Sequence, residues 1–112
     1  MSEKASTPEP PYYAVIFTSK RRPGDQGYER VAAEMVESVS RKKGFLGSES
    51  ARDEEGFGIT VSYWASLESI EGWKKDLAHQ AAKKKGRELW YEGYAIRFCL
   101  VQSASFWGSD PT

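Results

Sequence analysis

The segment Gly56–Trp73, with the sequence GFGITVSYWASLESIEGW, constrains the fold more than any other part of this chain. Its first half alternates apolar side chains with small or polar ones up to Trp64, which is the period-two pattern of a β-strand. Ser66 follows, and its hydroxyl can accept a hydrogen bond from the first turn of a helix. One stripe of that helix is apolar, at Leu67, Ile70 and Trp73. The segment therefore predicts a strand, a sharp turn and a helix that together place several aromatic rings at one end of a pocket.

The length and the charge balance of the chain exclude several classes of protein. With 112 residues we expect a single domain with one modest core. Sixteen basic and sixteen acidic residues cancel, which argues against a nucleic-acid or anionic-membrane partner. Cys99 is the single cysteine, so an internal disulfide is excluded and a cytoplasmic location is expected. The sequence contains neither an apolar run of about 20 residues nor the apolar core of a signal peptide, so we expect neither membrane insertion nor export.

Hydrophobic periodicity and turn residues divide the chain into six elements between two polar tails. The strands are expected at residues 12–19, 45–52, 57–64 and 94–102, with the second at an edge of the sheet. One helix is expected from about Asp25, with Gly44 as its left-handed stop, and another from Leu67 to about Asp76, followed by a helical segment at 77–85. A hairpin turn is expected at Asp53–Gly56. Residues 1–11 are predicted to be a disordered tail, and residues 103–112 form a second tail.

The order β-α-β-β-α-β predicts an α+β fold of the ferredoxin-like type, a four-stranded antiparallel sheet with both helices on one face. The domain spans residues 12–102. Three strands carry apolar residues on both faces, although two helices can cover only one face. We therefore expect a homodimer in which two sheets pack face to face, with Phe106 and Trp107 of the C-terminal tail lying on the partner subunit.

Several segments carry a resemblance to a known family: Gly44–Gly47, Ile59–Trp64, the helix from Ser66 to Trp73, His79, and Trp90-Tyr91 with Tyr94. Together they resemble the antibiotic biosynthesis monooxygenase (ABM) family of dimeric α+β barrel proteins. The resemblance covers about residues 12–102, nearly the whole of the predicted domain.

The resemblance implies a cleft between the sheet and the helices in each subunit. In the quinone-forming members of the family, such a cleft holds a small aromatic or polyketide-like substrate that reacts with dioxygen without a metal or an organic cofactor. His79 is the only histidine and would act as the base, and Arg97 would stabilise the developing oxyanion. The walls of the substrate site would come from six aromatic residues: Tyr63, Trp64, Trp73, Trp90, Tyr91 and Tyr94.

Each of these residues also has a structural interpretation. His79 lies in a polar helical stretch and suits the surface or an interface. Trp64 and Trp73 suit core packing, and Arg97 suits an ion pair across the dimer. The tyrosines fit the rim of a subunit interface as well as a wet pocket.

Two further functions stay open alongside the monooxygenase. One is a ligand-binding or dimerisation module that has the same fold and no catalysis. The other is haem binding or degradation, as in the haem-degrading branch of the fold, which uses a tryptophan on the second helix, a histidine ligand further along and an asparagine on the first strand. Trp73 matches the first of these positions, the ligand position falls near Lys83, and the chain has no asparagine, so Thr18 or Ser19 would replace it.

Overall fold

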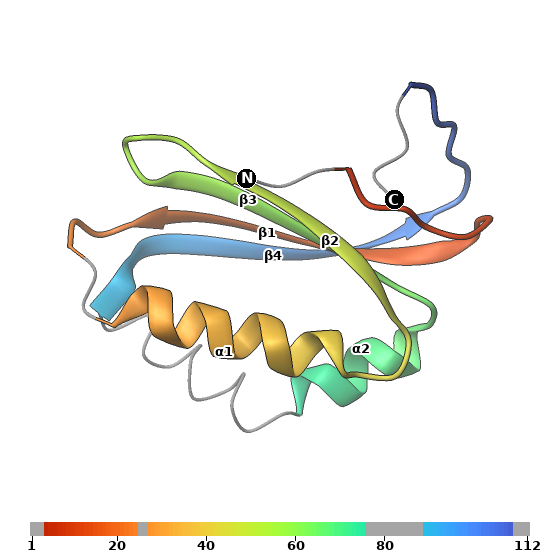
Figure 1. Cartoon of the computed structure of the whole chain (residues 1–112), viewed down its shortest axis with the longest axis horizontal. Helices are drawn as coiled ribbons and strands as arrows, with labels where there is room; N and C mark the ends of the chain where they lie inside the picture. The colour runs from red at the N-terminus through yellow and green to blue at the C-terminus, as the bar shows by residue number, and fades with distance from the viewer. Residues whose placement is uncertain (1–3, 25–26, 76–88, 109–112) are drawn as a thin grey trace.

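The computed structural model describes residues 4–24, 27–75 and 89–108. These residues form a sheet and a layer of helices below it (Figure 1). The strands are β1 (Tyr12–Arg21), β2 (Phe45–Arg52), β3 (Phe57–Trp64) and β4 (Tyr91–Val101), and the helices are α1 (Tyr28–Ser40) and α2 (Leu67–Lys74).

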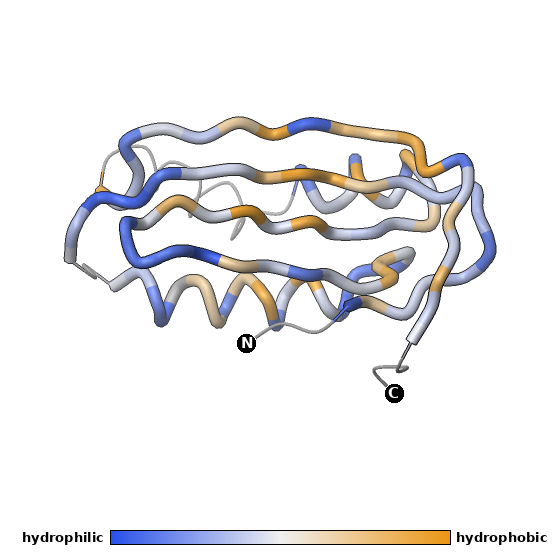
Figure 2. Tube along the Cα trace, turned by 90° about the horizontal axis from the view of Figure 1, so that it is seen from above, coloured by the Kyte–Doolittle hydropathy of each residue, from blue (hydrophilic) through white to orange (hydrophobic). Residues whose placement is uncertain are grey.

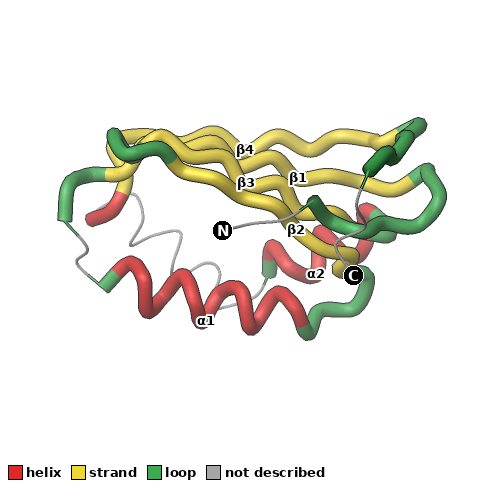
Figure 3. The backbone as a smooth tube through the Cα atoms, turned by 45° about the horizontal axis from the view of Figure 1, so that its top comes forward, coloured by secondary structure: helices red, strands yellow, loops and turns green. Residues whose placement is uncertain are grey.

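The sheet has the strand order β2-β3-β1-β4, and all three strand pairs are antiparallel. This is the predicted ferredoxin-like arrangement, with β2 at an edge and β1 inside the sheet. Both helices lie on one side of the sheet, as Figure 3 also shows. The other side, which we call the open face, carries no helix among the described residues.

The register assigns each side chain to one of the two faces. Val15 of β1 lies opposite Ser62 of β3 and Phe98 of β4, and these residues face the helices. Their neighbours Ile16, Val61 and Arg97 pair in the same way on the open face. Seen from the open side, hydrophobic and hydrophilic positions alternate along the strands (Figure 2).

The β3–α2 unit forms the centre of the core. Trp64 is fully buried and packs with Val15 and Ile70, which are each 2% exposed. The predicted cap is present, because the Ser66 hydroxyl accepts a hydrogen bond from the backbone N–H of Ser69. The Ser69 hydroxyl in turn accepts one from the backbone N–H of Ser66, which closes a reciprocal capping box.

The ends of several elements differ from the expectation, and β1, for example, ends at Arg21 and not at Ser19. Helix α1 ends at Ser40, four residues before Gly44, although Gly44 has the expected left-handed backbone, with φ 88°. Strand β4 begins at Tyr91, three residues before the predicted start, because pairing with β1 continues as far as Arg21 through a bulge. The helical segment predicted at 77–85 lies outside the described residues.

The N-terminal residues from 4 onward lie against the open face, where the sequence predicts a disordered tail. The backbone N–H of Ala5 donates to the carboxylate of Glu49 at 2.8 Å, and the hydroxyls of Thr7 and Tyr12 are hydrogen-bonded at 2.8 Å. Two hydrogen bonds thus connect this N-terminal segment to side chains of the sheet.

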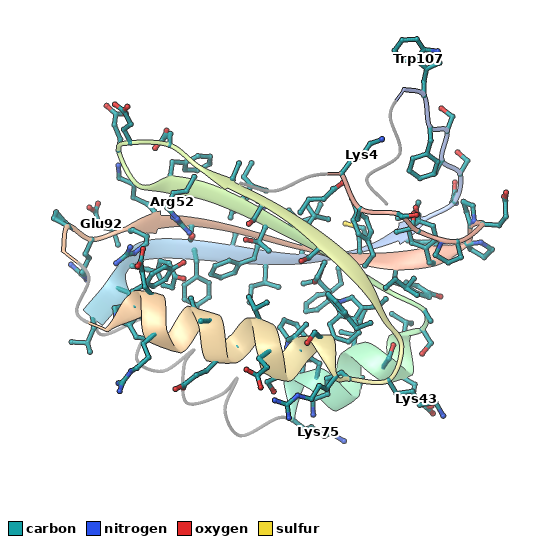
Figure 4. The ribbon with its side chains drawn as sticks, in the orientation of Figure 1. Lys4, Lys43, Arg52, Lys75, Glu92 and Trp107 are labelled. Atoms are coloured by element: carbon teal, nitrogen blue, oxygen red, sulfur yellow. The ribbon has the colours of Figure 1, made fainter. Side chains whose placement is uncertain are left out.

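The C-terminal segment leaves the sheet on the same side. Trp107 projects away from the body of the molecule and is 94% exposed (Figure 4). None of the helices in the described ranges has the length and apolar character needed to cross a membrane.

Candidate functional site

A cleft of about 440 Å³ lies between the sheet and helix α1. This volume is in the range of small-molecule sites in proteins. The helix contributes an apolar wall, and the lining residues of that wall are Ala32, Met35, Val36 and Val39. The cleft therefore has one side that favours the flat apolar surface of a ligand.

The opposite wall is lined by hydroxyl groups from the two adjacent strands β2 and β3. Ser48 pairs with Ser62 and Ser50 pairs with Thr60, and all four side chains line the cleft. They form a row because residues two apart on paired strands share one face of the sheet. Such a row can donate to or accept from oxygen substituents along one edge of a planar ligand.

Aromatic rings close one end of the cleft. Phe17 of β1 lies 5.6 Å from Tyr91 and 5.4 Å from Tyr94, measured between ring centroids. Tyr28, at the start of α1, meets Trp90 edge-on at 5.6 Å and Tyr91 at 6.0 Å. These separations are those of favourable aromatic pairs, so the five rings form a packed group, which we call the aromatic end.

Two guanidinium groups lie behind the aromatic end. The guanidinium carbon of Arg21 is 3.7 Å from the centroid of the Tyr28 ring, a cation–π contact. Arg52 reaches across the sheet from the edge strand and donates to the Ser19 hydroxyl at 2.8 Å and to the backbone carbonyl of Gly56. Gly58 provides the room for this, since a Cβ there would lie 2.6 Å from the guanidinium carbon of Arg52. Figure 4 shows Arg52 near the end of the sheet where α1 begins.

The residues of the aromatic end and the two arginines all affect the pKa of the Tyr91 hydroxyl. Burial raises the pKa of the Tyr91 hydroxyl well above its ordinary value, and the hydrogen bond and the charge interaction with Tyr28 raise it further. Arg52 and Arg21 act in the opposite direction on the same pKa, because their positive charges favour the ionised hydroxyl. Tyr91 is therefore a neutral hydroxyl donor near neutral pH, within the field of both arginines.

Four of the residues predicted for the substrate site line this cleft, and they are Trp73, Trp90, Tyr91 and Tyr94. Trp64 lies behind the wall: it is fully buried, packs 5.4 Å from both Phe45 and Trp73, and donates to the Ser62 hydroxyl at 3.0 Å. It supports the cleft from the core.

The other predicted site residues lie elsewhere. Tyr63 and Arg97 belong to the open face, on the other side of the sheet from the cleft. The Tyr63 hydroxyl donates to Glu49 at 2.7 Å, and burial followed by the interaction with Glu49 raises the Tyr63 pKa well above its ordinary value. Arg97 is exposed. His79 lies outside the described residues.

The positions weighed for haem also fall in different places. Trp73 lines the cleft, whereas Thr18 is on the open face. Ser19 faces the helices and is 2% exposed, with its hydroxyl bonded to Arg52. Lys83 lies outside the described residues.

Sequence reasoning missed Tyr28, Arg52 and the row of hydroxyls. Tyr28 lies near the start of the first predicted helix, and nothing in that segment indicates that its ring faces a cleft. A signal for the others was present in the alternation of the edge strand, where Ser48, Ser50 and Arg52 are spaced two apart. Three polar residues on one face of an edge strand predict that this face is exposed to solvent. Only the position of the helix shows that the face lines a cleft.

Comparisons with known proteins agree with this fold. The chain is 53% identical to the uncharacterized protein YqjZ of Bacillus subtilis over 97 residues. This alignment covers 87% of this chain and 85% of YqjZ. The crystal structure of SnoaB, a cofactor-independent oxygenase from Streptomyces nogalater, superposes with a TM-score of 0.71 at 10% identity, covering 83% of this chain and 95% of SnoaB. The structure of SO0527 from Shewanella oneidensis gives a TM-score of 0.73 at 10% identity, covering 90% of this chain and 98% of that one. The family model of antibiotic biosynthesis monooxygenases matches residues 11–85, and the chain belongs to that family.

Proposed function

We propose that this protein is a cofactor-independent monooxygenase that oxidises a small aromatic, polyketide-like compound in the cleft between the sheet and α1. The observation that carries the proposal is the amphipathic cleft itself, with an apolar helix on one side and four hydroxyl groups on the other. A planar ring system with oxygen substituents along one edge fits both walls. SnoaB, which shares the fold, is a cofactor-independent oxygenase.

The reaction would use the electrons of the substrate. A base removes a proton from an activated ring carbon or phenol, and the resulting carbanion or phenolate reduces dioxygen. One oxygen atom replaces two hydrogens to form a carbonyl group, and the other leaves as water, so that CH₂ and O₂ give C=O and H₂O. The protein would contribute orientation, a water-poor site and groups that stabilise the oxyanion.

His79 is our candidate for the base. Among the described lining residues, the titratable side chains are the tyrosines Tyr28, Tyr91 and Tyr94, and no carboxylate, lysine or histidine is present. A proton acceptor active near neutral pH would therefore come from the segment that contains His79.

Oxygen uptake tests this role. We expect the wild-type protein to consume oxygen with an anthrone or a naphthalenediol, and His79→Ala to lower the turnover number by about 10²-fold or more. The melting temperature of the variant should match that of the wild type. Unchanged turnover in His79→Ala would remove the histidine from the mechanism.

We also propose that the protein is a homodimer built on the open face. Phe57 and Ile59 of β3 are 50% and 41% exposed there, beside the apolar side chains of Ile16 and Val61. Contiguous exposed apolar surface of this kind favours a protein partner, and a second copy is the simplest one. In this arrangement Arg97 would face the partner subunit and pair with one of its carboxylates, and Trp107 would lie on the partner.

The absence of a carboxylate or histidine among the described lining residues also favours a second candidate, a ligand-binding module without turnover. Saturable binding of planar aromatic compounds without oxygen uptake, across quinols and flavonoids, would support that function over the oxygenase.

A further inference from the structure

We propose that the aromatic end of the cleft binds a permanently ionised oxygen group, so that the preferred ligand is an aromatic carboxylate held by Tyr28 and Tyr91 in the field of Arg21 and Arg52. The inference rests on the proposed function, because it concerns the same cleft, and it specifies the class of compound that the cleft selects.

Arg52 is held in a fixed position next to the aromatic end. Its guanidinium group lies flat over Gly58 and bonds to the Ser19 hydroxyl and the carbonyl of Gly56. Ser19 belongs to β1, Gly58 to β3 and Gly56 to the turn before β3, so the charge is held in one place. All the acceptors that hold it are neutral, which leaves its positive charge uncompensated by them.

Arg21 has a donor that no described residue satisfies. Its Nε is buried and has no hydrogen-bond partner among residues 4–24, 27–75 and 89–108, while one terminal nitrogen donates to the carbonyl of Gly24 at 2.8 Å. The Tyr28 ring covers the guanidinium group on one side. A buried donor on a charged group costs free energy unless a partner satisfies it, and an anion is the partner that would do so best.

Among the described residues, the charge at this end of the molecule is positive near the two arginines. Neither guanidinium group lies within ion-pair distance of a carboxylate in the part of the chain that the structure describes. By contrast, Arg41 at the other end of α1 pairs with Glu37. Two arginines without carboxylates, next to an aromatic cleft, form the environment that recognises a carboxylate.

Tyr28 and Tyr91 both line the cleft, and their ring centroids lie 6.0 Å apart. Arg21 stacks on the Tyr28 ring, and both arginines lower the pKa of the Tyr91 hydroxyl. A ligand oxygen at this end would accept from a tyrosine hydroxyl and interact with the arginines through charge. The rest of the ring system would extend between the hydroxyl row and α1.

A pair of isosteric probes tests the inference by isothermal titration calorimetry at pH 7. 2-Naphthoate and 2-naphthamide have the same ring system and nearly the same shape, but only the first is charged. We expect the wild-type protein to bind 2-naphthoate at least about tenfold more tightly than 2-naphthamide.

Three variants assign the preference to the residues named. Arg52→Gln and Tyr91→Phe should each reduce the preference for 2-naphthoate to about threefold or less while leaving the affinity for 2-naphthamide within about twofold. Arg52→Lys keeps the positive charge and should retain a larger preference for 2-naphthoate than Arg52→Gln. The comparison of these two variants separates the effect of the charge from that of structural support. Arg22→Gln is the matched control, because Arg22 is exposed and follows Arg21 in the sequence. The Arg22→Gln variant should prefer 2-naphthoate over 2-naphthamide as strongly as the wild type does.

The outcomes are distinct from those of the oxygenase test. Equal binding of the two probes, or a preference that survives both Arg52→Gln and Tyr91→Phe, overturns the anion site even if oxygen uptake is found. Binding of neither probe overturns it as well. A preference for 2-naphthoate that Arg52→Gln abolishes supports the site, and it does so even if no oxygen uptake occurs and the oxygenase proposal fails.

Discussion

The two faces of the sheet are built from the same four strands, yet they have become different surfaces. The helix-facing side holds the core at Trp64 and, next to it, a cleft with a cationic aromatic end. The open face carries exposed apolar residues such as Ile59 and a polar group centred on Glu49. The cleft exists on one face only among the described residues because the helix layer covers that face.

The comparison is sharpest for two tyrosines. Tyr91 in the cleft and Tyr63 on the open face both have a raised pKa, with burial as the leading cause. Their partners have opposite character, because Tyr63 donates to the carboxylate of Glu49, whereas Tyr91 lies near Arg21 and Arg52. The same residue type is therefore part of an acidic group on one face and of a cationic group on the other.

The largest effect is expected on the free energy of unfolding, from a substitution in the core on the helix-facing side of the sheet. Trp64→Ala removes a fully buried side chain that packs on Phe45 and Trp73, so the free energy of unfolding should fall by about 3–5 kcal/mol. Urea denaturation followed by circular dichroism measures it. Leu67→Ala is the control, since Leu67 is 55% exposed and lies in α2, away from the proposed interface, and its loss should be less than a third as large. Similar losses for the two variants would contradict the assignment of the core.

A smaller effect is expected on the association of two subunits, from a charged substitution on the open face. Ile59→Glu places a charge in the proposed interface between two sheets, so the dissociation constant of the dimer should rise by about 100-fold. Sedimentation equilibrium measures this constant.

Leu67→Glu controls for the added charge, because Leu67 is also exposed, at 55%, but belongs to α2 in the helix layer. It should leave the dissociation constant unchanged. A wild-type protein that is monomeric at low micromolar concentration, or a Leu67→Glu effect as large as that of Ile59→Glu, would rule out the open face as the interface.

The smallest effect is expected from alkaline titration, which compares the two tyrosines directly. The pKa of each hydroxyl is higher in the folded protein than the value of about 10 expected in the unfolded chain. Their contribution to stability is therefore complete below pH about 10 and is lost as the pH rises above that value. The melting temperature, measured by calorimetry from pH 8 to 11, should fall less steeply in Tyr63→Phe and in Tyr91→Phe than in the wild type. An equally steep fall in the double variant would show that the hydroxyls do not titrate in this way.

Much of the fold followed from local patterns. The bounds of β2 and β3, the hairpin between them, the Ser66 cap and the edge position of β2 were all predicted and are present, because alternation, turn residues and caps act within a few residues of one another. The ABM family was also identified from the sequence, and the family model confirms it. The sequence also determined which residues share a face of each strand.

The tertiary structure decided which of the two faces became the cleft. Arg97 and Arg52 both stand out as charges on strands, and nothing in their own segments indicates that β4 turns Arg97 to the open face while β2 turns Arg52 toward the helices. The place of Arg52 depends on the space above Gly58 and on Ser19 of another strand, 33 positions away in the chain. Contacts of this kind depend on how the strands pair and on which side the helices cover. A side chain that crosses a neighbouring strand contacts residues that the periodicity of its own segment does not bring together.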